Sequence, residues 1–311
     1  MFVATARGRC AHPRTRTARG LRCWMSLWRR VAHAHTAAGG LIALTFLSCA
    51  LGAAAAQSAL PVDRYPGAAA AYGVVVDGQL AWGRAIDSPR QPASLAKLLT
   101  AIVLLDGNWV PQAPIVVSKS AAAMPAMRLG LRAGDALAAR DALLAMLVRS
   151  ANDACAALVE HAAGSFAAFA LLMNERAGKL GMSASHFVNP CGLDAPGQYS
   201  TVRDLLLLAQ AAYEHPEIAA AVAQRSASVD TAAGRHLHFD NGNLLLSRMD
   251  GVIGMKSGFT SAAGRCLIAL ARRGTHQVWL VMLDAPQRWS VASGILFEAF
   301  DLAVQSEPTT Q

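Results

Sequence analysis

Three short patterns in this sequence carry side chains that could together perform acyl transfer on a serine. In chain order, they are Ser94-Leu95-Ala96-Lys97, Ser150-Ala151-Asn152 and Lys256-Ser257-Gly258. A serine hydroxyl is a weak nucleophile until a base removes its proton. A lysine can be that base only when burial or a neighbouring positive charge lowers its pKa. The patterns therefore predict a nucleophile, a base and polar groups that bind a substrate.

The scarcity of lysine makes the first pattern more informative. Of the 28 basic residues only four are lysines, and only Lys97 has a serine three positions before it. Arginine stays protonated, whereas a lysine with a lowered pKa can accept a proton. Residues three apart lie on one face of a helix, so a helix that begins near Ser94 would hold both side chains together. Taken alone, the pattern also fits a helix cap followed by a solvated lysine.

The other two patterns have simple structural explanations when each is taken alone. Ser150 and Asn152 stand between two helical runs, where both residue types are favoured caps. The third pattern could be a bulged strand with a surface lysine. On an edge strand, however, Gly258 would let a substrate backbone approach, and Lys256 would attract a carboxylate. Each pattern occurs once in the chain, and their combination favours a single catalytic site.

Hydrophobic periodicity predicts an α+β protein with strands near both ends and helices between them. An Asp77-Gly78 turn between two apolar runs predicts a hairpin over residues 71–82. Three further strands are expected over residues 251–260, 265–271 and 277–283. Helices are expected over residues 95–105, 141–149, 153–163, 166–180, 202–213 and 288–303. Strands from the two ends of the chain would then share one antiparallel sheet.

The body of the chain carries almost no net charge, although the whole chain has a formal charge of +8. Residues 1–56 contain eight arginines and no acidic residue, which leaves 20 basic and 20 acidic side chains in the remainder. A neutral body lacks the positive surface that polyanions require, so no nucleic-acid partner is expected. Hydrophobic residues make up 54% of the 311 residues, which is ample for a buried core.

The first 56 residues have the composition of a secretory signal. Arg29 and Arg30 precede an uncharged stretch over residues 36–56, which ends in Ala54-Ala55-Ala56 before Gln57. We expect cleavage before Gln57, and Met25 is a possible true start. The alternative is an uncleaved membrane anchor, because about 20 apolar residues can just span a bilayer. Either segment would deliver the rest of the chain to the periplasm or another extracytoplasmic location.

The three cysteines beyond this segment show no metal-binding or redox pattern. Cys155, Cys191 and Cys266 form neither a CxxC pair nor a zinc-like spacing, and an odd number cannot pair completely within the chain. We expect them to be small buried hydrophobic residues. His236 and His238 are expected to lie in a strand or loop. No metal or other cofactor is predicted.

The order S-x-x-K, S-x-N and K-[ST]-G resembles the motif set of penicillin-binding proteins and class A β-lactamases. Longer segments resemble the low-molecular-mass penicillin-binding proteins of the D-alanyl-D-alanine carboxypeptidase family. These segments are residues 92–101, 187–194, 197–205 and 254–264. The resemblance implies a β-lactamase/transpeptidase-like α+β fold, with an antiparallel sheet from both chain ends, flanking helices and an all-helical middle lobe.

The same resemblance implies a domain organisation. The expected parts are a signal peptide over residues 1–56, a lead-in over 57–67, a penicillin-binding catalytic domain over 68–303 and a tail over 304–311. Many relatives continue into a β-rich domain and an amphipathic anchoring helix, which are not expected here. Position 257 is serine where relatives usually have threonine, a change that keeps the hydroxyl group.

Carried over to this sequence, the family's mechanism gives each candidate residue a role. Ser94 would form the acyl-enzyme after Lys97 takes its proton, and Ser150 would relay a proton to the leaving D-alanine. Substrate would be bound by Asn152, Lys256, Ser257, Gly258, Phe259 and Thr260. Lys256 would bind the terminal carboxylate and would keep Lys97 neutral by like-charge repulsion. Backbone N–H groups of Ser94 and Phe259 would form an oxyanion hole.

The function that the resemblance implies is removal of the terminal D-alanine from peptidoglycan stem peptides, with β-lactam antibiotics as covalent inhibitors. The alternative is a D,D-endopeptidase that cuts cross-links. A β-lactamase is less expected, because none of Glu160, Glu175, Glu214 and Glu217 begins the Glu-x-x-Leu-Asn pattern of class A enzymes. A non-catalytic penicillin-binding sensor is also less expected, since no motif residue is missing.

Overall fold

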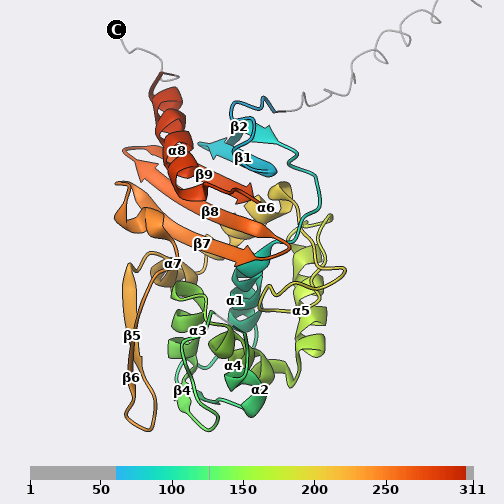
Figure 1. Ribbon diagram of the computed structural model, residues 1–311, viewed down its shortest axis with the longest axis vertical. Helices are drawn as coiled ribbons and strands as arrows, with labels where there is room; N and C mark the ends of the chain where they lie inside the picture. Colours follow the sequence, from blue (N-terminus) through green and yellow to red (C-terminus); the bar gives the residue numbers. More distant parts are fainter. Residues whose placement is uncertain (1–60, 126, 306–311) are drawn as a thin grey trace, which may run out of the picture. The chain divides into compact units, whose positions relative to one another are not determined.

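A five-stranded antiparallel sheet joins segments from the two ends of the described chain (Figure 1). The computed structural model describes residues 61–125 and 127–305, so the expected signal peptide lies outside the described residues. In spatial order the strands are β2 (Gln79–Arg84), β1 (Ala71–Val76), β9 (His276–Leu283), β8 (Gly264–Arg273) and β7 (Val252–Thr260). The predicted hairpin and the three predicted later strands are confirmed, and β7 forms an edge of the sheet.

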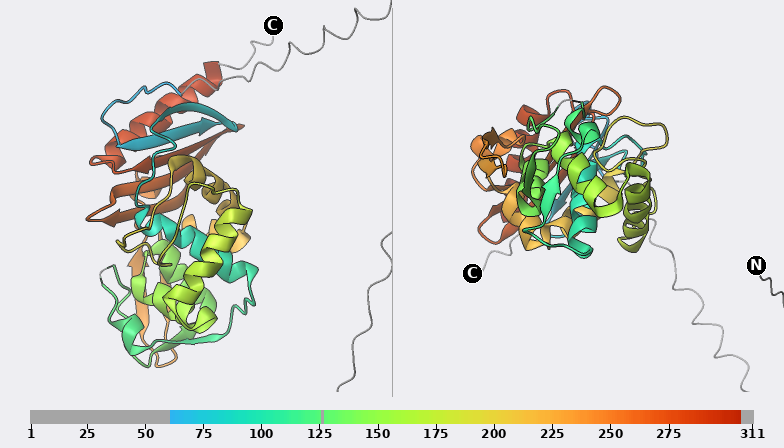
Figure 2. Two further views of the ribbon diagram at one scale, coloured as in Figure 1. Left: turned by 90° about the vertical axis from the view of Figure 1, so that its right-hand side faces the viewer. Right: turned by 90° about the horizontal axis from the view of Figure 1, so that it is seen from below.

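Both faces of this sheet are buried, and successive side chains along a strand enter different cores. On β8, Leu267 and Ala269 pack in the core beneath helix α8 (Arg288–Gln305), whereas Ile268 and Leu270 pack in the larger core toward the other helices. This two-sided burial explains why β8 and β9 read as continuous apolar runs rather than as alternating ones. Figure 2 shows α8 on one face of the sheet and the helical lobe on the other.

The middle of the chain forms the helical lobe. Its helices are α1 (Lys97–Asp106), α2 (Lys119–Ala122), α3 (Ala139–Val148), α4 (Asn152–Ala163), α5 (Phe166–Lys179), α6 (Val202–Tyr213) and α7 (Pro216–Val222). Short 3₁₀ helices η1 (Ala93–Ala96) and η2 (Leu244–Ser247) precede α1 and β7. No single helix in the described part has the length and apolarity to cross a membrane. The pair α4 and α5 passes that test together but is bent by 85°.

The helical lobe also carries two β-ribbons, which the expectation of an all-helical lobe missed. They are β3 (Pro114–Val116) with β4 (Ala136–Ala138), and β5 (Ser226–Asp230) with β6 (His236–Asp240). The first two strands have three residues each, too few to show a period. The second pair is rich in serine, histidine and aspartate, residue types that sequence patterns assign to loops.

Candidate active site

The first two sequence patterns meet at the amino group of Lys97. Lys97 Nζ lies 3.0 Å from Ser94 Oγ and 2.8 Å from Asn152 Oδ1. It also donates a hydrogen bond to the backbone carbonyl of Cys191. The lysine side chain is fully buried. One amine therefore joins a serine on the same helical segment to two acceptors from distant parts of the sequence.

The backbone at Ser94 is held in an unusual conformation. Ala93, the preceding residue, has φ of 49°, a left-handed value that residues with a Cβ rarely adopt. A Cβ atom at Gly192 would stand 2.0 Å from Ala93 O, and one at Gly258 would stand 2.9 Å from Ser94 N. Gly192 and Gly258, from different segments, thus both lie against the peptide between Ala93 and Ser94. Such strain persists only where the surroundings fix it, and it concentrates at functional sites.

Ser150 occupies the bend between α3 and α4. Its φ is 64°, and the cap residue of α4 is Ala151, so Ser150 does not serve as the helix cap that its residue type suggested. Its side chain is nearly buried at 6% exposure. Among the described residues, no hydrogen bond of its hydroxyl is found. Ser150 is placed two residues before Asn152, in a turn of left-handed backbone conformation.

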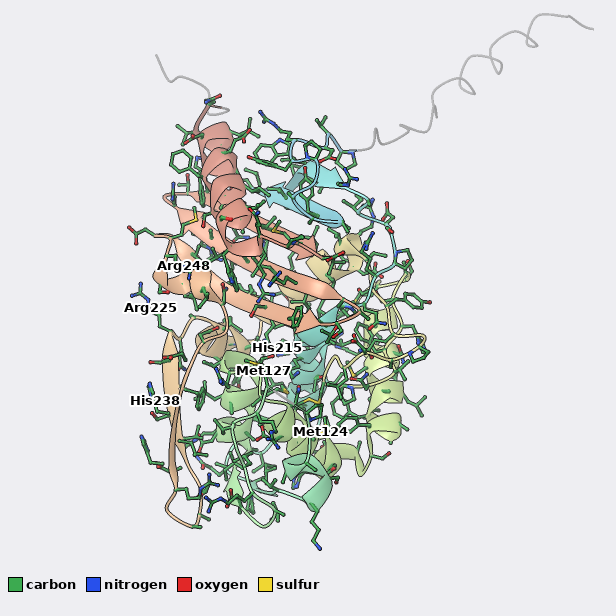
Figure 3. The ribbon with its side chains drawn as sticks, in the orientation of Figure 1. Met124, Met127, His215, Arg225, His238 and Arg248 are labelled. Atoms are coloured by element: carbon green, nitrogen blue, oxygen red, sulfur yellow. A yellow bond between two sulfur atoms is a disulfide. The ribbon has the colours of Figure 1, made fainter. Side chains whose placement is uncertain are left out.

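Two hydrogen bonds hold Asn152 against the segment that precedes β4. Its backbone N–H donates to Met127 O at 2.7 Å, and its Nδ2 donates to Pro125 O at 3.1 Å. Figure 3 marks this segment by Met124 and Met127. With its amide nitrogen and oxygen both engaged, Asn152 is fixed as an acceptor for Lys97.

Asp153, which the sequence analysis did not single out, fixes that same segment. Its buried carboxylate accepts hydrogen bonds from three successive backbone N–H groups, those of Leu129, Gly130 and Leu131, at 2.9 to 3.0 Å. The only signal in the sequence is an acidic residue in the first turn of a helix, a common feature. The structure shows that it clamps the loop which in turn holds Asn152.

The third pattern lies on β7, with Gly258 directly against the Ser94 backbone. Lys256 is 1% exposed and its Nζ donates to Ser257 O at 2.9 Å. Ser257 Oγ donates to Gly242 O at 2.9 Å. Phe259 extends outward with 61% of its surface exposed. The structure therefore brings all three patterns together around Ser94.

The side chains of Thr260 and Arg288 form hydrogen bonds with backbone atoms of β7, β8 and the turn between them. Thr260 Oγ1 accepts a hydrogen bond from Ala263 N at 3.1 Å, within the turn into β8. The Arg288 guanidinium, at the start of α8, donates to the carbonyls of Gly258 and Cys266. Arg288 thus joins β7 to β8, and β7 is an edge strand of the sheet.

Burial lowers the pKa of both lysines. Desolvation holds the pKa of Lys97 well below its usual value, and the positive charge of Lys256 lowers it further. The expected like-charge repulsion is present, but burial is the larger cause. Desolvation, followed by the charge of Arg288, lowers the pKa of Lys256 to about 7. The hydrogen bonds of both amines go to neutral oxygen atoms, so this region favours a neutral Lys97 and a bound anion.

The loop that carries Cys191 is braced from within. Asn189 and Gln198 both bind the backbone of Leu193, and Gln198 Oε1 also accepts from the N–H groups of Val188 and Asn189. Thr100 Oγ1, on α1, donates to Pro190 O at 2.6 Å. These bonds fix the shape of the segment over residues 187–194. The segment in turn holds the Cys191 carbonyl against Lys97 and Gly192 against the Ser94 backbone.

The three cysteines are buried, as expected, but two of them are more than small hydrophobic residues. Cys155 on α4 and Cys191 form a disulfide, with Cα atoms 6.0 Å apart. Cys266 is free and buried, as expected. The pairing could not be read from spacing, because 36 residues separate the two cysteines and only the fold brings them together.

The two histidines of β6 lie apart from this site. His236 Nδ1 contacts Asp230 at 2.8 Å, and His238 Nδ1 lies 3.0 Å from Ser228 Oγ, both across the β5–β6 ribbon. The strand alternative for these residues is confirmed. Over residues 61–125 and 127–305, no group of three or more His, Cys, Asp or Glu side chains is arranged to hold a metal ion.

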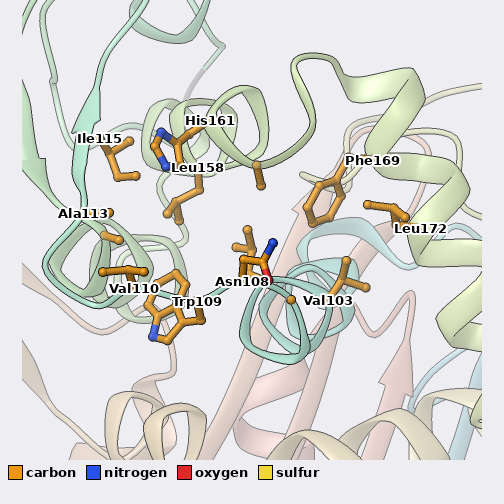
Figure 4. A pocket seen from close by; sticks show the side chains of 14 residues that line it. Val103, Asn108, Trp109, Val110, Ala113, Ile115, Leu158, His161, Phe169 and Leu172 are labelled. Carbon is orange, nitrogen blue, oxygen red and sulfur yellow. The ribbon is translucent and has the colours of Figure 1, made fainter.

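A cavity of about 390 Å³ opens at the opposite end of α1 (Figure 4). It lies between that helix, α4 and α5, with Val103, Leu158 and Phe169 in its wall. None of the motif residues lines it. The candidate site is therefore defined by the hydrogen-bonded cluster at Ser94 and the open edge of β7, not by this cavity.

Comparisons with known proteins identify the family. The sequence profile of the family described as D-alanyl-D-alanine carboxypeptidase matches residues 65–287. The carboxypeptidase DacC of Escherichia coli (strain K12) is 37% identical over 218 residues, which are 66% of this chain and 53% of DacC. A D-alanyl-D-alanine endopeptidase of Pseudomonas aeruginosa is 33% identical over 261 residues, covering 79% of this chain and 82% of that protein. This chain thus spans about half the length of DacC.

Solved structures show the same fold. The Streptomyces K15 DD-transpeptidase aligns with a TM-score of 0.70 at 27% identity, covering 78% of this chain and 99% of that one. The D-alanyl-D-alanine carboxypeptidase DacD from Francisella tularensis aligns with a TM-score of 0.67 at 26% identity, covering 74% and 70%. The β-lactamase/transpeptidase-like α+β architecture is thereby confirmed.

Proposed function

This chain belongs to the D-alanyl-D-alanine carboxypeptidase family, and from that membership we propose that it removes the terminal D-alanine from peptidoglycan stem peptides through an acyl-enzyme on Ser94. The observation that carries the proposal is the buried amine of Lys97, 3.0 Å from Ser94 Oγ. Burial favours the neutral amine, which is the form that can take a proton.

The hydrogen bonds of Lys97 support its role as the base. A neutral amine has two N–H groups and one lone pair. Asn152 Oδ1 and Cys191 O are carbonyl oxygens that only accept hydrogen bonds, so they take up both N–H groups. The lone pair then remains for the hydroxyl proton of Ser94. This arrangement supports Asn152 as a residue that positions the base, while its contact with the substrate amide stays a prediction.

The reaction then proceeds in two steps. Ser94 Oγ attacks the carbonyl carbon of the penultimate D-alanine as Lys97 takes the hydroxyl proton. The C–N bond breaks, and the proton reaches the leaving nitrogen through Lys97 and Ser150. Water next cleaves the ester, which releases the shortened peptide and restores the Ser94 hydroxyl. β-Lactams would acylate the same oxygen.

Substrate would lie along the open edge of β7. There Gly258 allows close approach, and the backbone N–H groups of Ser94 and Phe259 would stabilise the oxyanion. Lys256 would attract the terminal carboxylate, and the Ser257 hydroxyl would turn from Gly242 toward it. Thr260 is engaged in the turn into β8, so its hydroxyl could meet the carboxylate only as a hydrogen-bond donor.

A D,D-endopeptidase is the second candidate, because relatives with that name match at comparable identity. The E. coli endopeptidase is 35% identical over 202 residues, and this chain covers 82% of the P. aeruginosa one. Both reactions use the same acyl-enzyme and differ in what leaves: free D-alanine or a cross-linked side chain. We favour the carboxypeptidase on the family description, since the motif residues serve either reaction.

The deciding experiment offers the purified protein a pentapeptide stem and a cross-linked dimer, with products identified by mass. Loss of one alanine from the pentapeptide is expected; conversion of the dimer to monomers would instead assign the endopeptidase. Ser94→Ala should abolish either product and covalent labelling by a fluorescent penicillin. Labelling that persists in this variant would move the nucleophile elsewhere.

We also propose that the enzyme works outside the cytoplasm, where peptidoglycan lies. The signal peptide over residues 1–56 and the catalytic domain over 68–303 remain part of this proposal. N-terminal sequencing of the mature protein should return Gln57. Recovery of the intact segment in the membrane fraction would favour the uncleaved anchor.

A further inference from the structure

The amine of Lys97 is held between two structural supports that are far apart in sequence. One is Asn152, the first residue of α4, whose Oδ1 lies 2.8 Å from Nζ. The other is the carbonyl of Cys191, in the braced loop over residues 189–198. The position of Nζ relative to Ser94 depends on the distance between these two supports.

A covalent bond sets that distance. Cys155 lies on α4 three residues after Asn152, which is one helical turn, and it forms the disulfide with Cys191 itself. Cys191, whose carbonyl accepts one N–H of Lys97, is therefore covalently bonded to α4. The first residue of α4, Asn152, accepts the other N–H. Both sulfur-bearing side chains are fully buried, next to a fully buried lysine.

The geometry leads us to propose that the Cys155–Cys191 disulfide is a positioning element for the catalytic base, and that the enzyme becomes fully competent only when this bond forms. The inference rests on the proposed function and deepens it. The internal bonds of the loop fix its shape, and Thr100 fixes it to α1. The disulfide fixes the loop to α4. The two acceptors of the Lys97 Nζ hydrogen bonds, Asn152 Oδ1 and Cys191 O, are thereby held together.

Loss of the bond acts on the proton affinity of Lys97 as well as on its place. If the loop and α4 separate, water reaches an amine that is now desolvated. The pKa of Lys97 then rises toward its usual value, because desolvation is the main cause of its depression. The neutral fraction at neutral pH falls, and the hydroxyl of Ser94 loses its base.

Formation of the bond requires an oxidant of the disulfide class. Each thiol loses its proton, the two sulfurs join, and two electrons reduce the acceptor disulfide to two thiols. A thiol–disulfide oxidoreductase in an oxidising compartment supplies such a reaction. Because both sulfurs are buried in the folded chain, the exchange has to occur before the lobe closes. A chain folded in a reducing compartment would carry a weakened active site.

The test compares acylation of the unaltered protein with that of Cys155→Ala/Cys191→Ala. Rates of labelling by a fluorescent penicillin are measured from pH 6 to 9.5, well below the midpoint of thermal unfolding of each protein. We expect about a tenfold loss at pH 7 and recovery toward the unaltered rate at high pH, where a solvated lysine also becomes neutral. Each single variant should lose as much as the double variant, because either change breaks the same bond.

The matched control is Leu296→Ala, a buried change on α8 in the core on the far face of the sheet. It should lower the unfolding temperature without moving the pH profile. A double variant with the unaltered rate and pH profile would overturn the positioning role while leaving the proposed function intact. Peptide mapping that finds both thiols reduced in active protein would overturn it too. An unaltered protein that penicillin does not acylate would overturn both proposals.

Discussion

In the proposed reaction, the protonation state of the Lys97 amine decides whether Ser94 can react. The hydrogen bonds of Lys97 go to a hydroxyl and two carbonyl oxygens of the described residues, and Lys256 opposes a positive charge there. A neutral amine, in contrast, satisfies every group around it: two carbonyl oxygens accept its N–H groups and one hydroxyl donates to its lone pair. The site therefore stabilises a base at the expense of a cation.

Lys97→Arg tests this point directly. Arginine is similar in length but stays positively charged, so it cannot accept a proton. We expect the acylation rate by penicillin to fall by at least about a thousandfold, within the range that loss of a general base produces. The control is Lys119→Arg, the same change at an exposed position on α2, which should leave the rate unaltered. Retained activity in Lys97→Arg would remove Lys97 as the base.

The protonation of Lys256 should set the alkaline limit of substrate binding. Its pKa of about 7 means that the cation needed to attract a carboxylate is lost as pH rises through that value in the free enzyme. We expect KM for the peptide to rise on the alkaline side. Lys256→Arg should keep the charge and remove this rise, at some loss of fit in the buried site. Steady-state kinetics from pH 6 to 9 would show the change; an identical alkaline limb in both proteins would contradict it.

The residues of the site were only partly accessible from sequence. The three patterns named Ser94, Lys97 and Asn152 because their chemistry is local and their spacing is fixed by one helix or one bend. Asp153 and the disulfide were missed, because their importance depends on which distant segment the fold brings to them. A carboxylate in a first helical turn and a pair of cysteines 36 residues apart look ordinary until the loops are in place.

At the scale of elements, the site is a junction of η1, α4, β7 and the loop over residues 189–198. Three of them contribute backbone groups: η1 the strained peptide at Ala93, the loop the carbonyl of Cys191, and β7 the strand edge at Gly258. The close contacts among them leave no room for additional atoms. Small changes in the loop should therefore reach the nucleophile.

Gly192→Ala is the sharpest test of this junction. Gly192 has φ of +73°, and an added Cβ would stand 2.0 Å from Ala93 O, so the loop or the nucleophile has to move. We expect at least a hundredfold loss of acylation and a lower unfolding temperature. Gly294→Ala, in α8 with no atom within 4 Å of the added Cβ, should be neutral or slightly stabilising. Normal acylation by Gly192→Ala would show that the loop does not support Ser94.

The long elements were predictable and the short ones were not. The predicted helix over 202–213 is α6, and the predicted strands over 265–271 and 277–283 lie within β8 and β9. Their apolar pattern repeats often enough to reveal its period. The three-residue strands β3 and β4 each bury one hydrophobic side chain, Ile115 and Leu137, and one residue has no period. They form because the lobe supplies a partner strand.

For the whole molecule, two buried lysines make folding stability depend on pH. Lys256 has a pKa of about 7 in the folded chain and near 10.5 when exposed, so the unfolded chain binds more protons between these values. Stability is therefore lost as pH falls from 9 to 7, by on the order of 1 kcal/mol per pH unit for Lys256. Lys97 has a lowered pKa as well and acts in the same direction.

Lys256→Met should reduce this slope and raise the unfolding temperature at pH 7 by several degrees, because it removes a buried cation. Thermal unfolding followed by circular dichroism at pH 7, 8 and 9 measures both effects. Lys179→Met, an exposed change on α5, should leave the slope as it is. A slope that is the same in all three proteins would contradict the assignment of buried, neutral lysines.

The pairing of β1 with β9 has a consequence for the time at which the protein can fold. Strand β1 is synthesised early, yet its hydrogen-bonded partner ends at Leu283, more than 200 residues later, with Ala71 opposite Leu283. Contacts of such long sequence separation form slowly and late. The sheet that supports β7 cannot close until nearly the whole domain has left the ribosome. The five-stranded sheet of a growing chain therefore stays open for most of its synthesis.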